Sequence, residues 1–156
     1  MKYVALLRGI MPTNPNMRGE KLRAVFEGLK FKNVHTVIAS GNVVFDSSSK
    51  NTTELETKIE KELLKKLGFT STTMIRNHAE FEALVNKKPF KGVKDEKPNY
   101  LVVTFFKDRR KDLCTVIDLG ASKTPKFMAY IERKHGKAMT TRTWKTVNRI
   151  LKQMET

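Results

Sequence analysis

The sequence contains very little cysteine and no long apolar run. Cys114 is the single cysteine among 156 residues, so no internal disulfide can form and a reducing compartment is expected. No stretch approaches the roughly 20 apolar residues that a membrane-spanning helix needs. The opening segment MKYVALLRGI has no small-residue cleavage site and is interpreted as a strand rather than a secretory signal. We therefore expect a cytoplasmic protein that does not bind membranes.

The sequence also lacks the signatures of phosphate-binding loops, dinucleotide-binding folds, serine hydrolases and zinc proteases. The three histidines, His35, His78 and His135, are widely separated and have no paired ligand spacing. We expect no metal site and no cofactor. Cys114 lies beside Leu113 in a segment that we predict to be helical, which favours a structural thiol over a nucleophile. Whether the chain is an enzyme is left undecided.

Acidic residues are scarce relative to basic ones. Thirty-one Lys+Arg oppose 16 Asp+Glu, which gives a formal net charge of +15 and a pI near 10.0. Residues 1–76 carry 13 basic and 7 acidic groups, residues 77–120 carry 9 and 7, and residues 121–156 carry 9 and 2. Such a field attracts polyanions. Two interpretations remain open: a lysine-rich surface that serves solubility, or a surface that binds nucleic acid or another polyanion.

Hydrophobic periodicity predicts an α+β protein. The apolar content of 39% and the chain length fit a single compact domain, 1–156, with 1–76 and 77–156 as sub-units in an alternative division. In the first 76 residues, alternation predicts strands over 2–8, 34–38, 43–45 and 70–75, and helical spacing predicts helices over 19–30 and 52–67. This order, βαββαβ, is that of the ferredoxin-like split βαβ fold.

The helix over 52–67 has the clearest pattern. Four apolar residues repeat every four positions, and Leu64 is expected to widen their stripe. Thr53 and Glu56 are interpreted as a capping box, and Gly68 as the residue that ends the helix. The repeating residues are Leu55, Ile59, Leu63 and Leu67.

The second half is interpreted as a smaller α/β unit that partly repeats the first and packs against it. Asn77 and Glu80 predict the cap of a short helix, and an apolar strand follows over 100–106. We then predict a helix over 109–118, a strand over 126–132 and a closing helix over 142–154.

The closing helix has two opposite stripes. Trp144, Val147, Leu151 and Met154 share one face, and Arg142, Lys145, Arg149 and Lys152 are rotated from it by about 200°. One interpretation is an amphipathic helix with a solvated outer face. The other is a basic ridge, Lys145, Arg149 and Lys152, that contacts phosphates.

Three segments, ALLRGI (5–10), NVHT with SGNVVF (33–36 and 40–45) and TTRTWKTV (140–147), closely resemble the DUF1697 family. The resemblance implies a ferredoxin-like α/β architecture, and no activity is established for that family. This chain departs from the family pattern in two places. MPTNP (11–15) replaces the usual asparagine and glycine-rich loop, and Thr143 and Lys145 stand where two asparagines are usual.

These segments suggest a ligand-binding corner. Arg8 ends the first strand, and antiparallel pairing with the third strand would bring the turn at 40–42 beside it. The family resemblance adds residues 140–142, which we expect to precede and open the closing helix. The alternative is that Thr141 only caps that helix and that Arg8 pairs with a carboxylate. The proposed anion-binding residues are Arg8, Ser40, Asn42, Thr140, Thr141 and Arg142.

The element order also occurs in RNA-recognition modules, which stack bases on aromatic residues of their first and third strands. Here Phe45 and Tyr3 could serve, but the signature of those modules is absent, so we do not expect that mode of binding. The favoured function is binding of a polyanion or nucleic acid through a basic surface. The alternative is an enzyme or sensor that binds a small phosphorylated or carboxylated ligand at the corner of Arg8, Thr141 and Arg142.

Overall fold

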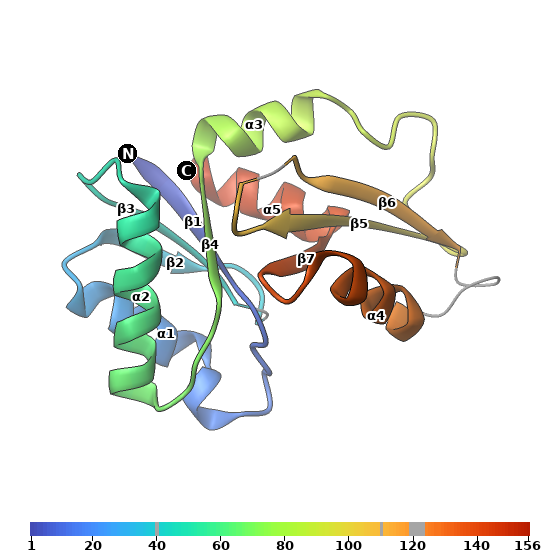
Figure 1. Cartoon of the computed structure of the whole chain (residues 1–156). Helices are drawn as coiled ribbons and strands as arrows, with labels where there is room; N and C mark the ends of the chain where they lie inside the picture. Colours follow the sequence, from blue (N-terminus) through green and yellow to red (C-terminus); the bar gives the residue numbers. More distant parts are fainter. Residues whose placement is uncertain (40, 110, 119–123) are drawn as a thin grey trace.

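A computed structural model describes residues 1–39, 41–109, 111–118 and 124–156. Within these ranges the chain has a mixed α/β architecture with five α-helices and two antiparallel sheets (Figure 1). The described part of the chain contains no helix that is both long and apolar enough to cross a membrane.

The first sheet has the strand order β2-β3-β1-β4, and every neighbouring pair is antiparallel. Its strands are β1 (Lys2–Leu7), β2 (Lys32–Thr36), β3 (Asn42–Asp46) and β4 (Thr73–Asn77). A 3-10 turn, η1 (Pro15–Met17), precedes α1 (Gly19–Gly28), and α2 (Thr52–Leu67) joins β3 to β4. The predicted antiparallel pairing of the first strand with the third is confirmed by β1 and β3, and β4 pairs with the other side of β1.

Helix α2 buries the predicted stripe. Leu55, Ile59 and Leu63 are at most 2% exposed, and Leu67 packs partly against the same cluster. The expectation that Leu64 widens the stripe is wrong, because this side chain is 50% exposed. Leu64 follows Leu63 by 100°, which places it at the border of the buried face.

The capping residue of α2 is Asn51 and not Thr53. The Asn51 side chain accepts a hydrogen bond from the backbone N–H of Glu54 at 3.0 Å. Glu56 has no part in the cap: its buried carboxylate accepts from the backbone N–H of Ile75 at 2.8 Å. Because β4 is an edge strand, this bond satisfies a donor that has no neighbouring strand.

The second sheet corrects two predictions. Its strands are β5 (Asn99–Phe106), β6 (Leu113–Asp118) and β7 (Met139–Thr143), in the order β6-β5-β7. The predicted helix over 109–118 is wrong because this segment pairs with β5 as β6. The predicted strand over 126–132 is wrong because it lies in α4 (Thr124–His135). Both β6 and β7 run antiparallel to β5, so they are parallel to each other and need a crossover, which α4 supplies.

Two further helices pack between the sheets. Helix α3 (His78–Asn86) has the predicted capping box of Asn77 and Glu80. Helix α5 (Trp144–Met154) starts later than predicted, with Thr143 as its cap. Residues 140–142 therefore belong to β7 and do not precede or open a helix, which corrects the expectation for Thr140, Thr141 and Arg142.

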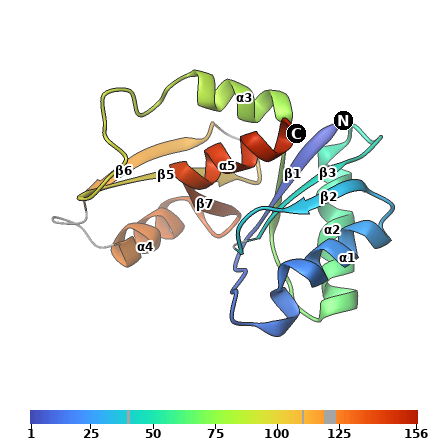
Figure 2. The same ribbon diagram turned by 180° about the vertical axis from the view of Figure 1, so that it is seen from behind.

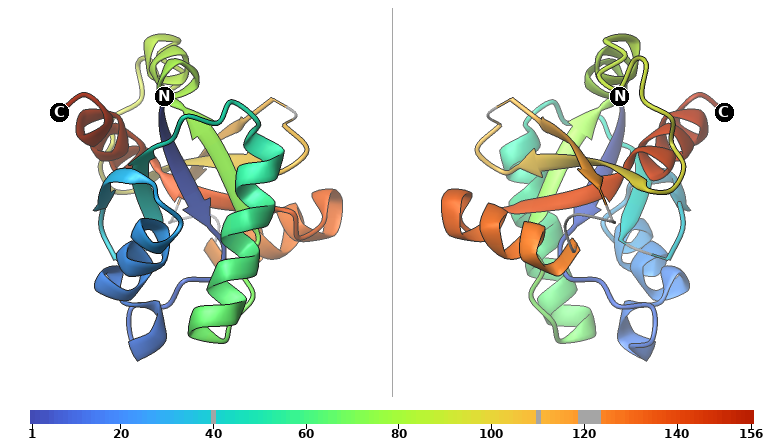
Figure 3. Two further views of the ribbon diagram at one scale, coloured as in Figure 1. Left: turned by 90° about the vertical axis from the view of Figure 1, so that its left-hand side faces the viewer. Right: turned by 90° about the vertical axis from the view of Figure 1, so that its right-hand side faces the viewer.

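The two faces of the first sheet have different covers. Tyr3, Ala5 and Leu7 of β1 contact the cluster formed with α1 and α2, whereas Val4 and Leu6 belong to a cluster that includes β5, α3 and α5. This alternation is the two-residue period of a strand with both faces buried. Figure 3 shows α1 and α2 on one side of the sheet and the second sheet beyond its other side.

Candidate functional site

The segments that suggested a ligand corner do meet, around the side chain of Arg142. Its Nε donates to Asn42 Oδ1 at 2.6 Å, and its Nη1 donates to Thr140 Oγ1 at 2.6 Å and to the Thr141 carbonyl at 3.0 Å. Its Nη2 donates to the carbonyl oxygens of Leu7 at 2.8 Å and of Gly41 at 3.3 Å. These acceptors come from the end of β1, the start of β3 and β7.

The Arg142 guanidinium has no donor left over. A guanidinium has five N–H groups, and the contacts above number five. The side chain is buried, and burial lowers the pKa of Arg142 to about 10. All five partners are neutral groups, so Arg142 joins the two sheets through hydrogen bonds to dipoles.

Gly41 permits this junction. Its φ is +82°, and a Cβ there would lie 2.6 Å from Ile10 Cγ1 and 2.9 Å from the Leu7 carbonyl oxygen. Asn42 is also engaged inside the protein, because its Nδ2 donates to the Val37 carbonyl at 2.9 Å. Ser40, the remaining residue proposed from this turn, lies outside the described residues.

The side chains of the other two predicted corner residues, Arg8 and Thr141, have partners outside the Arg142 cluster. Arg8 Nη1 donates to the Met139 carbonyl at 2.8 Å, and its Nη2 forms an ion pair with Glu132 of α4. The hydroxyl of Thr141 lies 3.0 Å from that of Thr104 on β5. The carboxylate partner that the alternative interpretation required for Arg8 is thus present.

Arg8 also lines an open pocket. The pocket has a volume of about 660 Å³, and its other cationic lining residues are Lys61 and Lys137. Thr57 and Glu60 face it from α2. The Thr57 hydroxyl and the three cationic side chains can bind an anion, whereas the carboxylate of Glu60 repels one.

Three of the four residues predicted for the basic stripe lie on the exposed face of α5, and the fourth does not. Arg142 points into the protein from β7, whereas Lys145, Arg149 and Lys152 are exposed. On the opposite face, Val147 is fully buried, and the rest of that face packs into the cluster between the sheets. The three cations therefore lie along the outer face of a firmly held helix.

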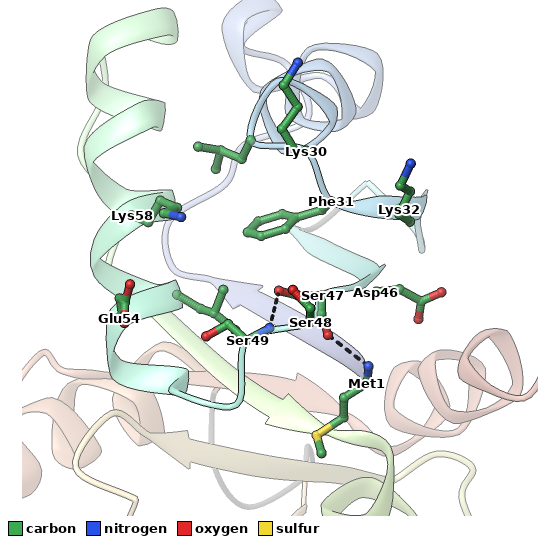
Figure 4. Close-up of a pocket in the computed structure, with 12 residues that line it drawn as sticks. Met1, Lys30, Phe31, Lys32, Asp46, Ser47, Ser48, Ser49, Glu54 and Lys58 are labelled. Atoms are coloured by element: carbon green, nitrogen blue, oxygen red, sulfur yellow. Dashed lines mark hydrogen bonds between the residues drawn. The ribbon is translucent and has the colours of Figure 1, made fainter.

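A further pocket, with a volume of about 520 Å³, lies between α1, α2 and the segment after β3 (Figure 4). The ring of Phe31 points between the two helices, and Lys30, Lys32 and Lys58 lie around the opening. Leu55 also lines the pocket. Its lining also includes two acids and three serines: Asp46, Glu54, Ser47, Ser48 and Ser49. With three lysines against two carboxylates, the pocket has only a weak preference for anions.

Sequence reasoning missed a charged pocket of about 500 Å³ between α3 and the second sheet. Arg76 is buried there and lies 3.7 Å from Asp112, and Arg109 binds Glu80 at 2.6 Å. Burial raises the pKa of Asp112 and of the Cys114 thiol, so neither group is activated as a nucleophile. The signal in the sequence was Arg76, a cation that directly follows the apolar pair Met74 and Ile75 in a predicted strand region.

Tertiary packing also brings Glu155, which follows α5, beside His78 and Glu82, two titratable residues one turn apart on α3. His78 Nε2 is inaccessible to solvent and lies 3.8 Å from Glu82 and 3.9 Å from Glu155. These donor atoms lie within 4.8 Å of one another, although the two glutamates are exposed. An imidazolium between two carboxylates would have the same arrangement, so the expectation of no metal site stays a prediction.

Comparison with known proteins gives a family and a structural relative. The model of the family described as "Protein of unknown function (DUF1697)" matches residues 1–133. The third resembling segment, 140–147, lies beyond that match. The conserved bacterial protein SP0830 from Streptococcus pneumoniae has a similar structure, with a TM-score of 0.76 and 18% identity over 99% of this chain and 98% of that one. No curated protein matches the chain.

Proposed function

We propose that this chain, which belongs to the DUF1697 family of proteins of unknown function, binds nucleic acid or another polyanion through a basic surface on α5. The observation that carries the proposal is the exposure of Lys145, Arg149 and Lys152 on one face of a helix whose opposite face is buried. A rigid helix presents its cations without a large ordering cost, so more of the attraction to phosphates is retained on binding.

The spacing of these cations suits a phosphate backbone. Lys145 and Lys152 are seven residues apart, or about 10.5 Å along the helix axis. Each strand of a duplex advances about 3.4 Å per phosphate along the duplex axis, so a ridge that lies along this axis spans roughly three phosphates. The net charge of +15 strengthens the attraction over a longer range.

The first sheet is an unsuitable binding surface. Its strand order supports a ferredoxin-like unit, but Tyr3 is 1% exposed and Phe45 is 0% exposed. RNA-recognition modules stack bases on exposed sheet aromatics. Binding is therefore proposed to occur on α5 and not on the sheet.

The proposal is tested by fluorescence anisotropy of labelled duplex DNA and single-stranded RNA at several salt concentrations. Replacing Lys145, Arg149 and Lys152 by Gln should reduce the slope of log K against log[salt] by roughly two to three, at about 0.9 for each phosphate contact on duplex DNA. The matched control replaces Lys21 of α1 and Lys65 and Lys66 of α2 by Gln; these lysines are exposed on the two helices at the far side of the first sheet. No binding at about 50 mM salt, or equal effects of both triple variants, would contradict a site on α5.

A second candidate function is binding of a small anion in the pocket beside Arg8. The supporting observation is that Arg8, Lys61 and Lys137 line one pocket. The five protein acceptors around Arg142 weigh against a direct part for that residue in ligand binding. If Arg8 serves a ligand, Arg8→Ala should abolish thermal stabilisation by inorganic phosphate or a nucleotide while changing the Tm of the free protein little. A large loss of Tm without ligand would instead assign Arg8 to the scaffold.

A further inference from the structure

A groove of about 410 Å³ lies beside the start of α5. It is formed by the segment that follows α3, by β5 and by Trp144. Phe90 and Val93 contribute apolar walls, and the exposed side chains of Lys88 and Lys91 belong to the same lining. Figure 2 shows α5 in front of the molecule with α3 above it.

Trp144 connects this groove to the basic ridge. On a helix with 100° per residue, Trp144 is rotated by about 80–100° from Lys152 and Lys145. It therefore lies at the border between the buried face and the cationic face of α5. Trp144 as a whole residue is partly exposed, and its ring packs edge-on against Phe90, with ring centroids 5.1 Å apart and planes at 69°.

The groove brings together two kinds of side chain that proteins use to bind single-stranded nucleic acids, which are cationic and aromatic ones. Such strands bind where cations follow the backbone and an aromatic ring stacks on a base. Here Lys88 and Lys91 line the groove together with Trp144, and Lys145, the next residue along α5, begins the ridge. One carboxylate, that of Asp95, lines the same groove and is outnumbered by the two lysines.

We propose that this groove receives an unpaired base of a single-stranded nucleic acid, which stacks on Trp144 while Lys88, Lys91 and the ridge bind the adjacent phosphates. The inference rests on the proposed polyanion binding and adds a preference for single strands. In a duplex the bases are already stacked and paired, so a duplex can bind the ridge but cannot fill the groove. The volume lies within the range of ligand-binding pockets, about 300–1,000 Å³.

The chain provides its own probe for this contact. Trp144 is the single tryptophan in the sequence, so emission excited at wavelengths that tyrosine does not absorb reports on the groove alone. Unlabelled oligothymidylate should quench this emission saturably, at the concentrations where anisotropy shows binding. A duplex of equal charge should bind with little quenching.

Two substitutions separate stacking from packing. Trp144→Phe keeps an aromatic ring, and Trp144→Leu keeps an apolar side chain against Phe90 but removes the stacking surface. Trp144→Leu should weaken oligothymidylate binding by roughly 5- to 150-fold and leave duplex binding unchanged. Trp144→Phe should weaken oligothymidylate binding less than Trp144→Leu does. Circular dichroism checks that both variants are folded.

The outcomes distinguish the two proposals. If oligothymidylate binds and the ridge variant weakens it, but emission is unchanged and Trp144→Leu binds normally, the groove is not the base site and the proposed function stands. If Trp144→Leu weakens duplex and single-strand binding equally, Trp144 acts through the fold of α5 and the inference is also overturned. If neither nucleic acid binds, both proposals fail.

Discussion

Arg142 offers the sharpest test of how the two halves are held together. We expect Arg142→Met to lower the free energy of unfolding substantially, because the native side chain joins β1, β3 and β7 by five hydrogen bonds. The three shortest bonds, at 2.6, 2.6 and 2.8 Å, would each contribute roughly 1.5–3 kcal/mol as bonds to a charged donor.

The burial of the charge offsets part of that gain. A decrease of the Arg142 pKa from 12.5 to about 10 corresponds to a cost of roughly 3 kcal/mol at about 1.4 kcal/mol per pKa unit. The expected net loss on Arg142→Met is therefore about 1.5–6 kcal/mol, out of a typical total of about 5–15 kcal/mol. Arg142→Lys should lose a similar amount, since one ammonium cannot reach acceptors on three strands.

The measurement is urea unfolding at neutral pH, followed by far-UV circular dichroism and by Trp144 fluorescence. Arg149→Met, an exposed arginine on α5, is the matched control and should change stability by no more than about 0.5 kcal/mol. A loss below about 1 kcal/mol for Arg142→Met, or full rescue by lysine, would refute the junction.

Three further perturbations test the fold and its titrating groups. Gly41→Ala should destabilise by roughly 2–4 kcal/mol in the same urea assay, because φ is +82° and the added Cβ would lie 2.9 Å from a backbone carbonyl oxygen; a neutral effect would contradict that close approach. Burial raises the pKa of Glu56 above 4.5, so its ionisation costs the folded state stability as pH rises through the raised pKa. Glu56→Gln should therefore gain stability relative to the wild type between pH 4.5 and pH 7, and the opposite trend in urea titrations at those pH values would count against this reasoning. Burial raises the pKa of the Cys114 thiol, so it should react slowly with iodoacetamide at pH 7.5 or so and faster in urea; rapid reaction of the folded protein would show an activated thiol.

Short-range sequence patterns correctly predicted the elements whose form depends on residues close together in the chain. The stripe of α2 and the capping box of α3 follow from contacts within a few residues, and both are confirmed. The predictions for 109–118 and 126–132 failed because strand pairing with β5 and the need for a crossover determined these segments. Neither requirement is visible from short-range periodicity.

The candidate site, too, could be predicted only in part from the sequence. The motif segments near Arg8, Asn42 and Arg142 could be recognised in the sequence, and the antiparallel geometry of a βαββαβ unit predicted that two of them would meet. Helical spacing also assigned Arg142 to the outer stripe of α5. Its pairing opposite Val103 on β5 decided otherwise, because a strand residue points to the face that its neighbours bury.

The sequence by itself determined the mixed α/β composition, the amphipathic helices, the excess of positive charge and the outward direction of Lys145, Arg149 and Lys152. Each depends on composition or on the period of one helix. Tertiary structure decided which charges are buried and which residues line a common groove, as with Lys88, Lys91 and Trp144. Such groupings arise when distant segments pack to bury apolar surface, and burial then determines which polar groups must be satisfied inside the protein.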